Sequence, residues 1–274
     1  MYNTDNKNEK VEILMKKVNK NNIGMFIDCD NVSAKYIESI FDDLSQYGTV
    51  NIRRAYGNWK DKKLYGWENV LQDYNIQPIQ QFAYTKGKNA TDIAMIIDIM
   101  DILYTKELEA IVLITSDSDF TPIVTRILSD GVTVYGYGES KTPMPFVNAC
   151  SQFIYVEKLS VLQNDEIEEV VEDVSINKSY DTSSNYIGNN YNMRKDFKLI
   201  NLLKQGIEKT SDEQGWADVK DMSVYIRKNS SFSQINYGFK KMADLIKALD
   251  LFDMEYLGER KTQLMIKIRD KKRK

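Results

Sequence analysis

The chain has 274 residues, of which 42% are hydrophobic, and a formal net charge of −3, values typical of a globular protein with one large domain or two smaller ones. It contains no histidine, which excludes Ser-His-Asp triads, histidine general bases and histidine-containing zinc sites. No apolar run reaches the roughly 18 residues of a membrane span, and the first ten residues, MYNTDNKNEK, are unlike a secretory signal. The two cysteines lack metal-ligand spacing and fit a reducing cytosol. We therefore expect a cytoplasmic protein without membrane contact.

Apolar runs alternate with helical periodicities between residues 22 and 160, after an N-terminal extension (1–21) that contains a short amphipathic helix at 9–20. Such alternation favours a parallel sheet covered by helices on both faces, so we expect a three-layer α/β/α domain over residues 22–160. Ser33 is expected to cap the first helix. The expected strands lie within 23–31 and at 49–56, 76–82, 109–115, 132–137 and 153–157, and the expected helices at 34–47, 61–74, 90–105, 119–129 and 144–150.

Pairs of acidic residues follow two of these strands. Asp28 and Asp30 end the first apolar run, and Asp117 and Asp119 follow the run at 110–115. Open α/β sheets bind ligands at the carboxyl ends of their strands, so the four carboxylates converge on one crevice if the two strands are neighbours. Because clustered like charge is costly without a neutralising cation, and oxygen ligands suit Mg²⁺ or Mn²⁺, this pattern predicts a divalent metal site.

One further acid is selected by its position in the helix expected at 90–105. Asp92 lies in the first turn and on the same face as Ile99, so we expect it to point toward the crevice. Asp98 and Asp101 point away from that face and are expected to be solvated charges. Any one of these acids could instead serve only to cap a helix, as aspartate often does, whereas all of them together favour a metal site.

The charge balance changes after residue 160. Residues 1–160 carry a net charge of −4, residues 161–192 carry −6, and residues 193–274 carry +7. Segment 161–192 is rich in Asp, Glu, Asn and Ser, which predicts an acidic, flexible linker. In the module that follows, residues 193–270, the pattern of three helices and two strands predicts a winged helix, and a basic tail follows at 271–274. Its first helix has a stripe of Phe197, Ile200, Leu203 and Ile207, further helices are expected at 218–228 and 237–249, and strands at 252–257 and 263–268.

Basic and aromatic residues give candidate RNA contacts. Lysines beside Gly87 are candidates to hold phosphates near the acidic crevice, and Arg53 and Arg54 are candidates to extend that basic track. In the basic module, Trp216 and Phe239 are expected in the core, whereas an exposed aromatic ring could stack on a base. Each cation could equally be a solvated surface charge, and the module could serve protein contacts. The candidate RNA-binding residues are Lys86, Lys88, Arg227, Lys228, Tyr237, Lys240 and Lys241.

Three motifs in the first domain resemble a known family. FIDCDN at 26–31, KGKNATDIAMIIDIMD at 86–101 and LITSDSDF at 113–120 occur in the order typical of the NYN domain, a branch of the PIN-like metal-dependent ribonucleases. The resemblance implies a PIN-like nuclease pocket that holds Mg²⁺ or Mn²⁺. It implies that the acids of this pocket, and its metal ligands, are Asp28, Asp92, Asp117 and Asp119, and that Asn31 and Ser116 are their polar companions. The role of Asp30, an additional acid, stays open.

The basic module resembles a LOTUS domain, also called OST-HTH, in the stretches DEQGWADVKDMSVYIRK at 212–228 and NYGFKKMADLIKALDLFDME at 236–255. LOTUS modules imply RNA binding. We therefore expect a hydrolase, a metal-dependent ribonuclease whose LOTUS module recruits RNA, with RNA as its partner and homo-oligomer formation compatible with the sequence. The mode of cleavage, endonucleolytic or exonucleolytic, stays open.

Two alternatives also stay open. One is an RNA-binding adaptor that keeps the fold without cleaving. The other is a phosphatase of the haloacid-dehalogenase type, which the pattern Asp28-x-Asp30 and the residues Thr115 and Ser116 resemble superficially.

Overall fold

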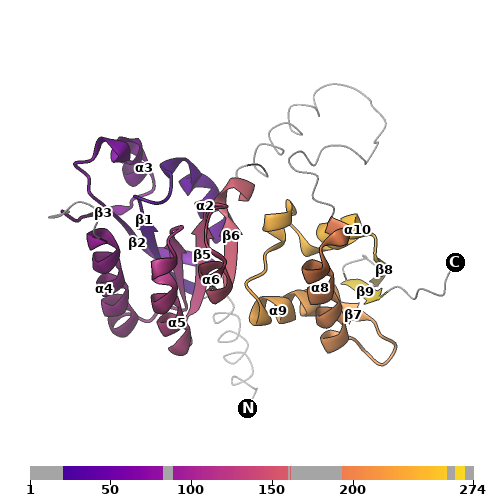
Figure 1. Ribbon diagram of the computed structural model, residues 1–274. Coiled ribbons are helices and arrows are strands. Elements are labelled where there is room, and N and C mark those ends of the chain that lie inside the picture. Colours follow the sequence, from indigo (N-terminus) through magenta and orange to yellow (C-terminus); the bar gives the residue numbers. More distant parts are fainter. Residues whose placement is uncertain (1–20, 83–88, 160, 162–192, 258–262, 269–274) are drawn as a thin grey trace, which may run out of the picture. The chain divides into compact units, whose positions relative to one another are not determined.

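A computed structural model describes residues 21–82, 89–159, 161, 193–257 and 263–268 (Figure 1). The chain divides into two compact units, Met1–Phe146 and Val147–Lys274. Several predictions lie outside the described residues: the helix at 9–20, Lys86, Lys88, the basic tail and the linker apart from Val161. Among the helices that the structure describes, none combines the length and the apolar composition needed to cross a membrane.

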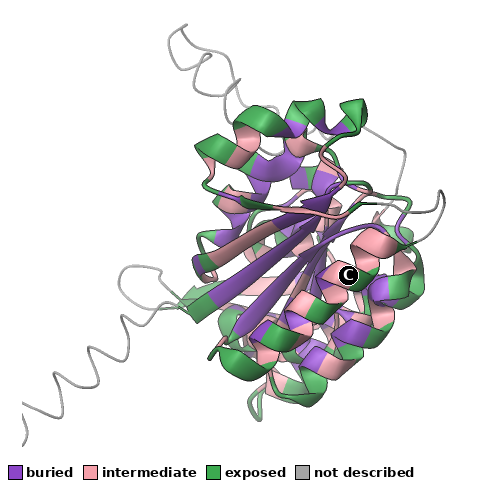
Figure 2. Ribbon diagram, turned by 90° about the vertical axis from the view of Figure 1, so that its left-hand side faces the viewer, coloured by how far each residue is buried: buried purple, intermediate pink, exposed green. Residues whose placement is uncertain are grey.

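Six strands form one parallel sheet in the order β3-β2-β1-β4-β5-β6, with helices on both faces (Figures 1 and 2). This confirms the predicted three-layer α/β/α fold. The strands are β1 (Asn21–Asp28), β2 (Gly48–Gly57), β3 (Gln77–Gln80), β4 (Ala110–Ile114), β5 (Thr133–Gly138) and β6 (Gln152–Tyr155).

The two central strands are the most apolar. Every residue of β4 is buried, and so is every residue of β1 from Ile23 onward (Figure 2). Because helices cover both faces of the sheet, the side chains on both sides of a central strand are buried. The strands therefore read as continuous apolar runs and not as an alternation of apolar and polar residues.

The helices differ from the prediction in four places. The helix expected at 119–129 begins with a 3₁₀ turn, and the helix expected at 237–249 begins only at Met242. The helix expected at 34–47 begins as a 3₁₀ turn, and Ser33 lies at its N-cap position without making a capping side-chain hydrogen bond. The helix expected at 61–74 is split in two, and Asp61 caps the first part by accepting from the backbone N–H of Lys63 at 3.0 Å. The helices of this fold are η1 (Ala34–Tyr36), α2 (Ile37–Leu44), η2 (Lys62–Trp67), α3 (Glu68–Asp73), α4 (Ala90–Thr105), η3 (Ser118–Phe120), α5 (Thr121–Ser129) and α6 (Met144–Ala149).

The LOTUS-like part of the chain has the predicted winged-helix arrangement. Three strands form an antiparallel sheet in the order β7-β9-β8. The elements are η4 (Met193–Lys195), α8 (Phe197–Thr210), β7 (Ala217–Asp218), α9 (Val219–Asn229), η5 (Gln234–Tyr237), α10 (Met242–Leu249), β8 (Phe252–Leu257) and β9 (Gln263–Ile268).

The face of α8 that packs into the core differs from the predicted apolar stripe. Leu199, Leu203 and Ile207 are buried in the core, whereas Phe197 is 75% exposed. The side chain of Asp196 accepts from the backbone N–H groups of residues 198 and 199, both at 3.0 Å, so the helix begins at Phe197. In the first turn of the helix, the buried residue is Leu199 and not Phe197, so the prediction for Phe197 is wrong.

A buried acid links α2 to β5. Asp43 accepts hydrogen bonds from the hydroxyl of Tyr137 at 2.6 Å and from Nε2 of Gln46 at 2.7 Å. Burial raises the pKa of Asp43 to about 6, although both hydrogen bonds act in the opposite direction. Ionised Asp43 therefore destabilises the fold at neutral pH.

This gives a prediction of pH-dependent stability. The pKa of Asp43 is higher in the folded chain than the ~3.9 of an unfolded aspartate, so its protonation stabilises the fold below pH ~4, and this contribution is lost as the pH rises through about 6. Asp43→Asn removes the charge and keeps an oxygen that can accept from Tyr137. We expect it to increase the free energy of unfolding at pH 7.5 by up to about 3 kcal/mol and to change it little at pH 4.

Thermal or urea unfolding at the two pH values measures this difference. Asp42→Asn, at the exposed neighbouring position, is the matched control and should have little effect at either pH. Equal effects of Asp43→Asn at pH 4 and pH 7.5 would show that the charge of Asp43 is not responsible.

Candidate functional site

The order of the strands places the acidic residues at the switch point of the sheet. β2 and β3 lie on one side of β1, and β4 then returns to its other side. In the parallel pairing of β1 with β4, Ile27 lies opposite Ile114, so Asp28 and Thr115 follow at the carboxyl end of the sheet. Open α/β sheets form their ligand crevice at such a point.

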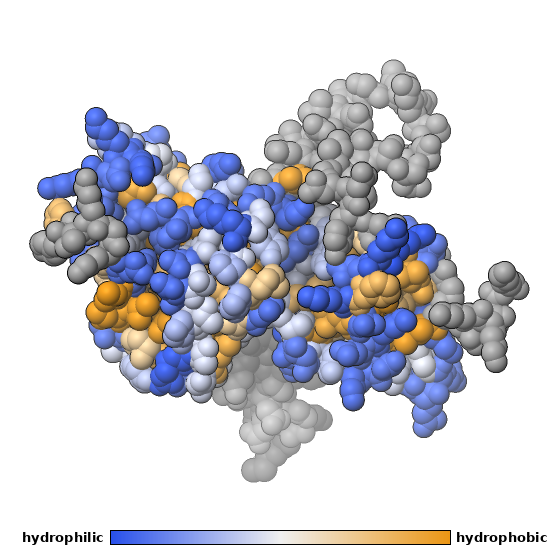
Figure 3. Space-filling model, in the orientation of Figure 1, coloured by the Kyte–Doolittle hydropathy of each residue, from blue (hydrophilic) through white to orange (hydrophobic). Residues whose placement is uncertain are grey.

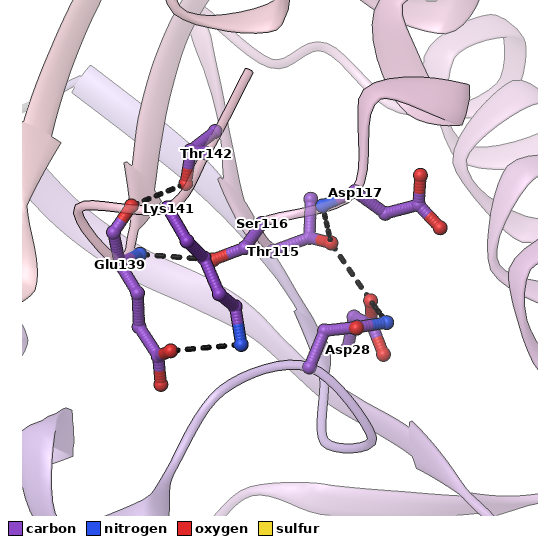
Figure 4. A network of polar contacts seen from close by, with 8 residues as sticks. Asp28, Thr115, Ser116, Asp117, Glu139, Lys141 and Thr142 are labelled. Carbon is purple, nitrogen blue, oxygen red and sulfur yellow. Dashed lines mark hydrogen bonds and ion pairs between the residues drawn. The ribbon is translucent and has the colours of Figure 1, made fainter.

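Asp28 is the best anchored of these acids. Its side chain is fully buried and accepts a hydrogen bond from Thr115 Oγ1 at 2.7 Å (Figure 4). It accepts two more, from Asn31 Nδ2 at 2.8 Å and from the backbone N–H of Asp30 at 3.2 Å. Burial raises the pKa of Asp28, and the hydrogen bonds from Thr115 and Asn31 oppose the rise. The carboxylate is therefore held in one orientation. The residue expected as its polar companion, Asn31, does contact it.

Thr115 connects the two strand ends. Its hydroxyl donates to Asp28 and accepts from the backbone N–H of Asp117 at 3.1 Å (Figure 4). This bridging role of Thr115 was not predicted from the sequence. Its only indication was position, because Thr115 is the first polar residue after the apolar run of β4.

Asp117 and Asp119 contact neighbouring donors. Asp117 Oδ1 accepts from the backbone N–H of Asp119 at 2.8 Å and so caps η3. Asp119 Oδ2 accepts from Asn89 Nδ2 at 3.0 Å, which joins this loop to the start of α4. Asp117 therefore caps a helix, which was the alternative to metal binding for any single acid, whereas Asp119 does not.

Asp92 shows that the acids converge. It lies half-buried in the first turn of α4, as expected. Burial, together with the negative charges of four neighbouring carboxylates, raises its pKa to about 6. These neighbours are Asp28, Asp117, Asp30 and Asp119. Four carboxylates from two strand ends thus lie close enough to Asp92 to oppose its ionisation.

The donor set fits a hard divalent cation in its chemistry. All five groups are carboxylates, the ligand type that Mg²⁺ and Mn²⁺ prefer, and their mutual repulsion would be relieved by positive charge. Within the described residues, however, no group of three or more acidic, cysteine or histidine side chains is arranged to hold a metal ion. The side chains of Asp117 and Asp119 are directed to the backbone and to Asn89 instead.

Ser116 has a different position from the one its expected role requires. Its side chain is buried, and its Oγ accepts from the backbone N–H of Glu139 at 2.9 Å (Figure 4). It therefore holds the loop after β5.

Arg53 and Arg54 are also used within the fold. Arg53 donates to the carbonyl oxygens of Val50 and Tyr74 at 3.0 and 2.7 Å. Arg54 forms an ion pair with Asp98, which also accepts from the hydroxyl of Tyr56. The expectation of a solvated Asp98 is therefore wrong, because α4 packs this residue against β2. Asp101 is exposed, as expected.

In the LOTUS-like part, Arg227, Lys228, Lys240 and Lys241 are exposed. Tyr237 is half-buried, its hydroxyl donates to Asp196 at 3.0 Å and its ring packs against Phe232. These contacts indicate a structural role for the ring of Tyr237. Phe239 is in the core as predicted, whereas Trp216 is only half-buried and lies under the ammonium group of Lys267.

Comparison with known families agrees with this geometry. Residues 22–160, half of the chain, match the NYN domain family. The chain belongs to the NYN family. Residues 195–263 match the OST-HTH/LOTUS domain family, so both resemblances are confirmed.

Comparison with individual proteins adds little to this NYN assignment. A search of curated proteins returns no match. One similar solved structure is that of VPA0982, a protein of unknown function from Vibrio parahaemolyticus RIMD 2210633. It is 18% identical, the similarity covers 50% of this chain and 94% of that chain, and the TM-score is 0.42.

The crowding of charge in the NYN domain predicts that one neutral substitution is stabilising. Asp92→Asn removes repulsion with four neighbouring carboxylates, so we expect the melting temperature of the protein in EDTA to rise by a few degrees at pH 7.5. Asp101→Asn, at an exposed position of the same helix, should leave it unchanged. Differential scanning calorimetry measures both. A lower melting temperature for Asp92→Asn would mean that the carboxylate contributes more by its contacts than it costs by repulsion.

Proposed function

We propose that this protein is a metal-dependent ribonuclease, in which the NYN domain hydrolyses RNA phosphodiester bonds and the LOTUS module binds the RNA. NYN domains suggest PIN-like nucleases, and OST-HTH domains suggest RNA binding. The observation that carries the proposal is the convergence of Asp28, Asp30, Asp117 and Asp119 on Asp92 at the switch point of the sheet. Such a charge cluster is costly for stability and is explained by a functional requirement.

The residues proposed to hold Mg²⁺ or Mn²⁺ are Asp28, Asp92, Asp117 and Asp119. When bound, such an ion supplies activated water and stabilises negative charge on the phosphate. The chain itself supplies orientation. Thr115 and Asn31 fix the carboxylate of Asp28.

The distribution of charge supports a division of roles between the domains. Residues 1–160 carry a net charge of −4, which repels a polyanion, whereas residues 193–274 carry +7. An RNA bound by the LOTUS module would be presented to the tethered NYN domain at a high effective concentration. The LOTUS module is therefore proposed to lower the RNA concentration required for cleavage.

One observation favours an alternative function. Asp117 and Asp119 already have hydrogen-bond partners that give them a structural role, which is compatible with an RNA-binding adaptor that does not cleave. The two functions differ in a single measurable property, the appearance of shorter RNA products.

Cleavage of end-labelled single-stranded RNA in Mg²⁺ or Mn²⁺ distinguishes them. We expect products from the unmodified protein, none in EDTA, and a loss of at least about a hundredfold in rate for Asp28→Asn and Asp117→Asn. Asp101→Asn is the matched control and should cleave normally, and all variants should still bind RNA. RNA binding without cleavage under any of these conditions would favour the adaptor.

A second prediction concerns the LOTUS module. Reversing the charge of two exposed residues on α9, with Arg227→Glu and Lys228→Glu together, should weaken RNA binding at least tenfold at low salt, because phosphate contacts are lost. The slope of log Kd against log salt should fall by about 0.7 for each lost contact to single-stranded RNA. The control, with the same change in net charge, is the pair Lys195→Glu and Lys209→Glu. Equal losses for both pairs in filter binding would indicate only a general effect of charge.

A further inference from the structure

A polar cavity adjoins the carboxylates of the NYN domain. It has a volume of about 300 Å³ and is formed by residues 29–34 after β1, by η2 and by the loop after β5. We call it the lysine pocket, because Lys63 and Lys141 contribute to its wall from two different elements. Nothing in the proposed metal chemistry uses these two residues.

The lysine pocket is directly connected to the acidic cluster. Asp30 and Asn31 line it, and Nδ2 of Asn31 donates to Asp28 at 2.8 Å. Its opposite wall is attached as well, because the backbone N–H of Glu139 donates to Ser116, the residue between Thr115 and Asp117 (Figure 4). A molecule in the pocket would therefore lie next to the carboxylate centre, at a position fixed by hydrogen bonds.

Both lysines are available for an anion. Lys141 pairs with Glu139 at 2.9 Å, but its side chain is 64% exposed, and a solvent-exposed pair of this kind is weak enough to exchange partners. Lys63 is exposed and lies near Asp30: burial raises the pKa of Asp30, and the charge of Lys63 opposes this rise. A phosphate group between the two lysines would replace the weak Lys141–Glu139 ion pair and accept charge-assisted hydrogen bonds from both ammonium groups.

The remaining lining indicates what the phosphate is attached to. Ser33 makes no capping hydrogen bond with its hydroxyl, and Asn31 has a carbonyl oxygen beside its bonded amide, so both can contact a ribose or a base edge. Trp67 lines the pocket but is only 2% exposed, so it offers little ring surface for stacking a base. A cavity of this volume lies at the lower end of small-molecule pockets, which suits one nucleotide.

We propose that the lysine pocket binds the ribonucleotide adjacent to the scissile phosphate, with Lys63 and Lys141 contacting its phosphate oxygens. The inference rests on the proposed function, because it places the scissile bond at the carboxylates. In this proposal, Ser116 keeps the loop that contains Glu139, one wall of the pocket, in a fixed position relative to the acidic residues.

Binding of single nucleotides tests the pocket independently of cleavage. The full-length protein is titrated in EDTA with AMP, CMP, GMP and UMP, and separately with inorganic phosphate, by isothermal titration calorimetry. We expect saturable binding of a nucleoside monophosphate that is about tenfold weaker in Lys63→Glu and in Lys141→Glu. Lys62→Glu, at the neighbouring position outside the pocket, should bind normally. Inorganic phosphate should bind more weakly than the nucleotide.

Cleavage kinetics provide the second measurement. Lys63→Glu and Lys141→Glu should raise KM for RNA about tenfold and leave kcat within a factor of about two, since they act on binding. Circular dichroism confirms that these exposed substitutions leave the fold intact. The milder variants Lys63→Gln and Lys141→Gln should show smaller effects in the same direction.

The outcomes separate this proposal from the proposed function. If the nucleotide binds and both lysine variants lose it while no RNA is cleaved, the pocket stands and the ribonuclease function is overturned. If RNA is cleaved with unchanged KM in both variants, the function stands and the pocket is overturned. Equal effects of Lys62→Glu, or phosphate binding as tight as nucleotide binding, also overturn the pocket as a nucleotide site.

Discussion

The parallel pairing of β1 with β4 is the constraint on which the rest of this site depends. It ends two buried strands side by side, and both strands continue into acidic residues. Burial of the strands stabilises the fold through their apolar side chains, whereas the same geometry brings like charges together. The structure lessens that cost with hydrogen bonds, of which Asp28 alone receives three.

Two kinds of acid in this fold differ in how their burial is compensated. Asp43 is isolated from other carboxylates and receives its hydrogen bonds from a tyrosine and a glutamine. Asp92 has a raised pKa for two reasons, burial and the charge of its neighbours. Only the second arrangement concentrates negative potential at one place. Asp92, and not Asp43, therefore lies where the proposed cation would relieve repulsion between carboxylates.

Much of the architecture could be predicted from the sequence, because it follows from local patterns. The apolar runs of β1 and β4 are continuous since both faces are covered, and the first-turn position of Asp92 followed from helical spacing. The resemblance to NYN and LOTUS domains depended on motifs and gave the order of the domains. These features require no knowledge of which side chains meet.

The predictions that failed concern contacts between distant residues. The partner of Asp98 is Arg54, 44 positions earlier in the chain, and no local pattern indicates this pair. Ser116 bonds to Glu139, which lies on the loop after the next strand. The stripe through Phe197 fitted a helix, but Leu199 packs into the core of the module in its place, and this packing involves residues far along the chain.

The shared hydroxyl of Thr115 has a consequence for how the site can change over evolutionary time. Because one oxygen serves both Asp28 and the backbone N–H of Asp117, loss of this hydroxyl alters the environment of both acids, and the free-energy effects of substitutions at Thr115 and at Asp28 are not additive. A lineage that lost the hydroxyl would loosen both acids in a single step. Conversely, restoring one acid would be of little use while the hydroxyl was missing. The two acids and Thr115 are therefore expected to be kept or lost as a unit.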